Sequence, residues 1–153
     1  MNLKTEQYLR ELDQQFLLVE QESEDEIRSL LANYLCIRTS GLLETFIKGR
    51  ISDYIDKKAP KEVKRYIATK MKDITSLNAK KIVSVLDAFS NTWSTGFQLY
   101  IDCHEQEKNS LNSIVANRHN IAHGQNSRVT FANMKQYYTD IKGVIAELDK
   151  IIK

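Results

Sequence analysis

The scarcity of chain-breaking residues is the feature that most restricts how this chain folds. Its 153 residues include one proline and only five glycines. These are the residues that most often end helices and form tight turns. A chain with so few of them favours helices joined by short connections. We therefore predict an all-α fold, and the chain length fits one domain over residues 1–153.

Helical periodicity is visible along most of the chain, because apolar residues recur at three- and four-residue spacing. The pattern predicts an antiparallel bundle of five to seven helices. The expected segments are 5–21, 24–56, 60–71, a helix after Asn78, a short helix around Trp93 that ends near 104, 106–123 and 130–152.

Local residues refine these boundaries. Ser23 followed by Glu26 predicts a capping box at the start of the second helix. Asn78 and Thr130 are expected N-caps, and Gly41 indicates a bend or a close helix crossing. The inward-facing stripes of the first three helices are expected to include Leu17, Ile27, Leu30, Tyr34, Val63 and Tyr66.

Charge is unevenly distributed. The charged residues of segment 1–26 are mainly acidic, whereas segment 48–81 carries eleven Lys or Arg against four acidic residues. The basic section is either a solvated helical surface or a surface that attracts a polyanion. Cys36 and Cys103 fit a reducing compartment, and no apolar run reaches the roughly 20 residues that a membrane span needs. We expect a cytoplasmic protein with no membrane association.

One short run, from Arg118 to Gly124, brings several chemically capable side chains together near the end of the sixth helix. It contains two of the three histidines, His119 and His123, four residues apart and on one flank. Arg118 falls within the apolar face, where a guanidinium must be paired, reach solvent, or line a cavity or subunit interface. Arg118 and His123 differ by about 140° around an ideal helix. Asn120 points to the opposite side.

Two other interpretations of this run deserve comparison. Cations near a helix C-terminus, followed by glycine, also stabilise the helix end without any further role. A zinc site formed by Cys103, His104, His119 and His123 has poor ligand spacing. Recognisable nucleophile and phosphate-loop motifs are missing. We therefore predict no metal and no cofactor.

The run Arg-x-x-x-x-His-Gly near the end of the penultimate helix resembles the HEPN superfamily, and more narrowly its RiboL-PSP branch. The similarity covers most of the chain. It also includes the Leu43-Glu44-x-Phe46-Ile47 segment, the aromatic segment around Trp93 and the closing helix 130–152.

This resemblance implies a metal-independent endoribonuclease that acts as a homodimer, with Arg118 and His123 of two subunits lining a shared cleft. His119 stands where the family usually has an asparagine, and Asn120 follows. Gln125 stands where some relatives carry a tyrosine that a partner enzyme modifies. Toxins with an antitoxin partner and antiviral defence effectors occur among such enzymes.

The expected chemistry follows from RNA itself, which carries its own 2′-hydroxyl nucleophile. His123 is expected to act as general base or acid, since histidine changes protonation near neutral pH. Arg118 is expected to bind the scissile phosphate, with His119 sharing proton transfer and Asn120 contacting substrate. The alternatives are a catalytically silent module that binds RNA, a nucleotide or a protein, and a plain helical adaptor.

Overall fold

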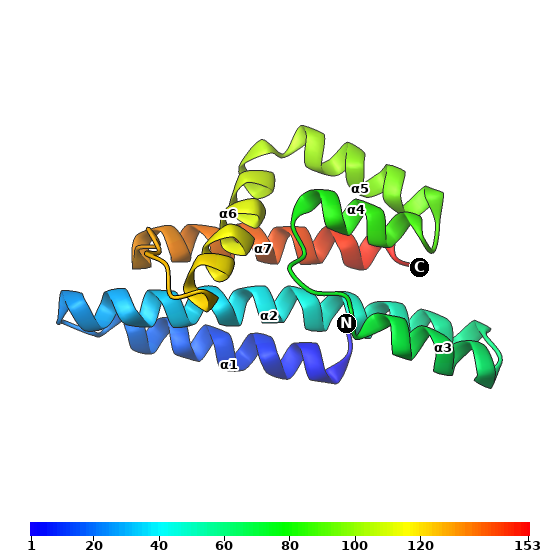
Figure 1. The fold of residues 1–153 in the computed structure, drawn as a ribbon, viewed down its shortest axis with the longest axis horizontal. Coiled ribbons are helices and arrows are strands. Elements are labelled where there is room, and N and C mark those ends of the chain that lie inside the picture. Colours follow the sequence, from blue (N-terminus) through cyan, green and yellow to red (C-terminus); the bar gives the residue numbers. More distant parts are fainter.

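The computed structural model describes residues 1–153 as seven helices without strands, which confirms the all-α prediction (Figure 1). In chain order these are α1 (Leu3–Glu20), α2 (Asp25–Lys58), α3 (Lys61–Met71), α4 (Ala79–Asp87), α5 (Asn91–Cys103), α6 (Glu105–Ala122) and α7 (Phe131–Ile151). None of the helices combines the length and hydropathy that crossing a membrane requires.

The long helix α2 is the centre of the bundle. It packs against α1, α6 and α7, while α4 and α5 form a pair on the far side of α7 from α1 (Figure 1). The core contains 30 buried apolar residues, with Phe46 of α2 and Phe97 of α5 as its largest fully buried side chains. Burial of this apolar surface is the main stabilising contribution to the fold.

Polar caps define several helix starts. The side chains of Asn78 and Thr130 accept hydrogen bonds from the backbone N–H groups of Lys81 and Asn133, which confirms both predicted N-caps. The predicted capping box at Ser23 is wrong. The N-cap of α2 is Glu24 and makes no side-chain cap bond. Its own N–H donates instead to the Glu22 carboxylate, at 2.9 Å.

Gly41 lies within the uninterrupted helix α2 and marks a close helix crossing rather than a bend. A Cβ atom at this position would lie 2.6 Å from the Tyr8 hydroxyl oxygen of α1. That hydroxyl donates a hydrogen bond to the Arg38 carbonyl of α2, at 3.0 Å. A side chain at position 41 would therefore displace the Tyr8 hydroxyl and disturb its hydrogen bond to Arg38.

Several apolar residues that were expected to face inward are exposed. They are Leu17, Ile27, Leu30, Tyr34, Val63 and Tyr66. For α3 the physical reason is clear, because it contacts only α2 among the helices and buries only Met71. Helical periodicity predicts that a face is apolar, but whether another element covers that face depends on the packing of the whole chain.

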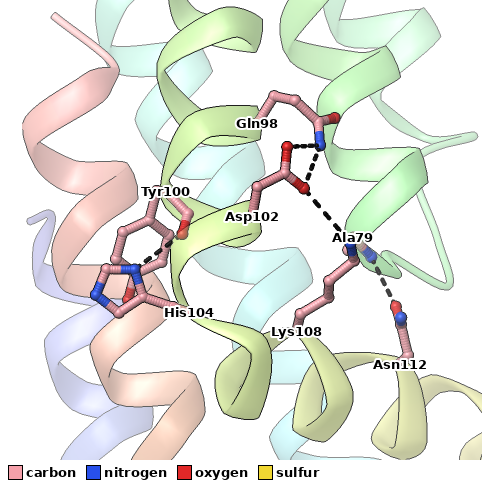
Figure 2. A network of polar contacts seen from close by, with 7 residues as sticks. All are labelled: Ala79, Gln98, Tyr100, Asp102, His104, Lys108 and Asn112. Carbon is pink, nitrogen blue, oxygen red and sulfur yellow. Dashed lines mark hydrogen bonds and ion pairs between the residues drawn. The ribbon is translucent and has the colours of Figure 1, made fainter.

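The corner between α5 and α6 sets the direction of α6 (Figure 2). The His104 ring stacks on Tyr100, and its Nδ1 donates to the Tyr100 carbonyl at 2.8 Å. Asp102 accepts hydrogen bonds from Gln98 and pairs with Lys108 at 3.5 Å. One turn further along α6, the Asn112 side chain accepts the first N–H of α4, from Ala79, at 3.1 Å. The start of α6 is thereby tied to α4 and α5.

Candidate active site

Helix α6 places the Arg118 side chain between α2 and the loop that joins α3 to α4. Ile114 and Leu111, about one and two turns earlier on the same helix face, are fully buried. Arg118 continues this face and remains about a third exposed, with a side-chain accessibility of 31%. The predicted position of a guanidinium within an apolar face is therefore observed, and the charge reaches solvent.

Arg118 is paired within its own chain. Its Nη1 donates to Ser76 Oγ at 3.0 Å and lies 3.7 Å from Glu44 Oε1. The same Glu44 oxygen accepts the Ser76 backbone N–H at 2.8 Å. Helix α6, helix α2 and the loop that joins α3 to α4 thus meet at this contact. The Glu44 carboxylate that orients the guanidinium is itself only 13% exposed. Charge-assisted contacts of this kind fix orientation more effectively than neutral ones.

Ser76 has an unusual backbone conformation. Its φ is +53°, which is uncommon for a residue other than glycine. The hydrogen bond from its N–H to Glu44 and the contact of its hydroxyl with Arg118 hold this conformation. The loop therefore places a hydroxyl group next to the guanidinium at some conformational cost.

A buried thiol lies beneath Arg118. Cys36 of α2 is fully buried and donates to the Ile114 carbonyl, with 3.5 Å between sulfur and oxygen. Burial raises the pKa of this thiol to about 12, against the opposing effect of the nearby Arg118 charge. Cys36 is therefore protonated at neutral pH and has the character of a structural residue rather than a nucleophile.

The two histidines of the motif come together at the end of α6. The ring centroids of His119 and His123 are 4.4 Å apart, with an angle of 56° between the ring planes. Both side chains are exposed. This arrangement agrees with the four-residue spacing and presents two imidazoles side by side to solvent.

A specific backbone motif ends α6 just after these histidines. Gly124 has a φ of +66°, and its N–H donates to the Ile121 carbonyl at 3.1 Å. The N–H of Gln125 donates to the Asn120 carbonyl at 2.8 Å. These two bonds form a Schellman motif, which requires the left-handed conformation that glycine adopts without strain. The predicted role of Gly124 in ending the helix is confirmed.

The remaining predicted site residues are placed as follows. Asn120 is half-buried, and its side chain makes no hydrogen bond within the chain. No hydrogen bond or ion pair joins Arg118 to His119 or His123. His104 stands at the opposite end of α6, against Tyr100 (Figure 2). No group of three or more His, Cys, Asp or Glu side chains is arranged to hold a metal ion.

Sequence reasoning missed Glu44 and Ser76 as partners of Arg118. Glu44 carried a detectable signal, since it interrupts the apolar run Leu42, Leu43, Phe46 and Ile47, whose side chains are all buried. A carboxylate flanked by core residues is expected to have a cationic partner. Ser76 lies in a loop with no pattern that indicates its conformation.

The fold and the site together define an all-helical domain with an anchored arginine and two adjacent imidazoles at one helix end. The family described as RiboL-PSP-HEPN matches residues 4–153, so the chain belongs to this HEPN family. Comparison with curated proteins and with solved structures found no match.

Proposed function

We propose that this protein is a metal-independent endoribonuclease that cleaves RNA through attack of the 2′-hydroxyl group. The observation that carries the proposal is the convergence on one end of α6 of an anchored guanidinium and two adjacent, exposed imidazoles, in a chain of an HEPN family. A role in a toxin–antitoxin or defence system, in the cytoplasm, is part of the same proposal and rests on the family resemblance alone.

In the proposed reaction, a histidine accepts the 2′-hydroxyl proton while the 2′-oxygen attacks phosphorus. A second proton donor protonates the departing 5′-oxygen, and the products are a 2′,3′-cyclic phosphate and a free 5′-hydroxyl. His123 acts as general base or acid, and the neighbouring His119 shares proton transfer. Arg118 binds the scissile phosphate and stabilises its additional charge in the transition state. Asn120 contacts the substrate.

The homodimer completes this site in the proposal. Arg118 pairs with Glu44 and Ser76 of its own chain, and no hydrogen bond joins it to His123 of that chain. A second copy that brings its own His123 next to Arg118 would form a cleft with both groups on one phosphate. Closed two-fold assembly then gives two equivalent clefts.

Cleavage of labelled RNA in EDTA by the wild type and by the variants Arg118→Ala and His123→Ala tests the proposal. The wild type is expected to release products with cyclic phosphate ends. Each variant is expected to lose about a hundredfold or more in rate, as is usual for groups that transfer protons or stabilise charge. Folded variants that cleave as fast as the wild type would contradict the mechanism.

The main alternative is a catalytically silent RNA-binding module, because the ion pair of Arg118 with Glu44 reduces the charge available to stabilise a transition state. The Glu44 carboxylate already partly neutralises Arg118, so a phosphate must compete with it. In that case RNA binds with a steep salt dependence but is not cleaved. Measuring RNA binding across a salt series, alongside the cleavage assay, separates the two functions.

A further inference from the structure

A groove lies between α3 and α4, far along the chain from the Arg118 run. It has a volume of about 780 Å³, and eight of its eleven lining residues are hydrophobic. Val63, Tyr66 and Ile67 of α3 form one wall, and Val85 and Phe89 form the wall at α4. The two helices do not pack against each other, so the space between them is open to solvent.

The α3 wall of this groove has no partner in the chain. Val63 is 43% exposed and Tyr66 is 63% exposed, although both lie on the apolar stripe of the helix. An amphipathic helix normally buries this stripe, because exposed apolar surface costs free energy. Contiguous apolar surface bordered by polar residues is typical of a site that binds another molecule.

The charged residues that line the groove are two lysines, and no acidic residue lines it. Lys70 and Lys81 are among the lining residues, and Lys70 Nζ lies 5.7 Å from the centroid of the Tyr66 ring. Between residues 57 and 81 the chain has nine Lys or Arg and two acidic residues. An occupant that matches this surface must therefore be apolar on one side and negatively charged on the other.

We propose that this groove binds an acidic amphipathic helix from a partner protein. The apolar residues of such a helix, at i, i+3, i+4 and i+7, would cover the exposed stripe of α3. The 11 residues of α3 give the wall a length of about 16 Å, so about three turns of partner helix would cover it. RNA would satisfy the lysines but leave the apolar lining uncovered, so the protein helix is the better match.

Fluorescence anisotropy with a synthetic probe tests this proposal. The probe is a labelled helical peptide with leucines at i, i+3, i+4 and i+7 and glutamates at its other positions. One control peptide has the same composition in scrambled order, and a second has lysines in place of the glutamates. The acidic amphipathic peptide is expected to bind the full chain at least about tenfold more tightly than either control. No binding, or equal binding of a control peptide, would overturn the proposal.

Two variants locate the binding surface. Val63→Ser/Tyr66→Ser removes exposed apolar groups and is expected to weaken binding about tenfold. The matched control, Leu30→Ser/Leu99→Ser, removes two similarly exposed leucines that do not line the groove. It is expected to bind the peptide as the wild type does. Equal effects of both double variants would show non-specific adhesion and refute the site.

A charge-reversal variant distinguishes a protein partner from RNA. Lys70→Glu/Lys81→Glu is expected to weaken binding of the acidic peptide and to reduce the salt dependence of that binding. The same variant is tested with a single-stranded RNA oligonucleotide. Loss of RNA binding with unchanged peptide binding would overturn the proposal and assign the surface to nucleic acid.

Discussion

At the scale of single residues, Glu44 contacts both Ser76 and Arg118 of the candidate site. Its carboxylate accepts the Ser76 N–H and faces the Arg118 guanidinium, while the nearby Leu43 and Phe46 are buried in the core. It therefore links the position of a charged site residue to the packing of α2. The proposed ribonuclease depends on this link, because Arg118 has to meet a phosphate in a defined orientation.

Substitution of Glu44 tests that link. Glu44→Gln keeps an oxygen acceptor for Ser76 but removes the charge, so the free energy of unfolding should fall by no more than about 1 kcal/mol at this partly exposed pair. Glu44→Ala also leaves the Ser76 N–H without its acceptor and should cost about 1–3 kcal/mol. Urea unfolding measures both changes. The control Glu11→Gln, at a pair with Arg38 that is more exposed, should be close to neutral. A Glu44→Ala protein as stable as the wild type would show that this contact does not stabilise the fold.

The buried Cys36 thiol predicts a dependence of stability on alkaline pH. Its pKa is raised from 9.0 to about 12 in the folded chain by burial. Between these values the unfolded chain has released the thiol proton while the folded chain retains it. The folded state then binds more protons, so its stability falls as pH rises through this window. Cys36→Ala lacks the group and should lose stability less steeply over the same range in urea unfolding. If the free energy of unfolding of the two proteins falls equally with pH, the raised pKa of Cys36 is contradicted.

At the scale of elements, the end of α6 is set by backbone conformation rather than by side-chain packing. A Cβ atom on Gly124 would meet nothing within 4 Å, yet its φ of +66° disfavours any other residue. Gly124→Ala should therefore destabilise the protein by about 1 kcal/mol, with Gly124→Asn less harmful. The control is Gly96→Ala within α5, where a Cβ atom makes only ordinary contacts. That change should be neutral or stabilising in thermal unfolding. A stabilising Gly124→Ala would contradict the Schellman geometry.

Helix α3 is expected to be the least stable helix of the bundle. It contacts only α2 and buries only Met71, whereas α2 and α7 each contribute many core residues. Local opening of α3 exposes little additional apolar surface and so costs little free energy. Amide hydrogen exchange of the isolated protein should be faster in α3 than in α2 or α7. Equal protection in the three helices would show that α3 is stabilised by contacts beyond those seen here.

The helices and their caps were more predictable from the sequence than the contacts between them. The helix ends at Asn78, Thr130 and Gly124 depend on hydrogen bonds between residues a few positions apart. The local sequence is therefore enough to predict them. The pairing of Arg118 with Glu44 and Ser76 instead joins positions 74 and 42 residues apart, brought together only by the packing of α6 on α2. Exposure of Leu30 and Tyr66 was unpredictable for the same reason. Periodicity describes one helix and not its neighbours.

At the scale of the whole molecule, the bundle presents two surfaces with different character. The end of α6 presents the polar groups of the proposed RNA site, and the groove between α3 and α4 presents apolar and basic side chains. The loop that joins α3 to α4 contributes to both, because its Ser76 contacts Arg118 and its Ile74 lines the groove. The proposed mechanism calls for a second chain, because no hydrogen bond or ion pair joins Arg118 to His123 within one copy. Assembly of two copies is therefore the central claim of the proposed mechanism.

Mixing two inactive variants tests that claim most directly. Arg118→Ala and His123→Ala chains, carrying different tags, are co-expressed, and the mixed dimers are purified and assayed for RNA cleavage in EDTA. If each cleft takes Arg118 from one copy and His123 from the other, a mixed dimer has one intact cleft of two. It should then recover about half of the wild-type rate, while each variant alone stays inactive. Purified mixed dimers without activity would contradict the shared cleft, and full activity of either variant alone would contradict the site itself.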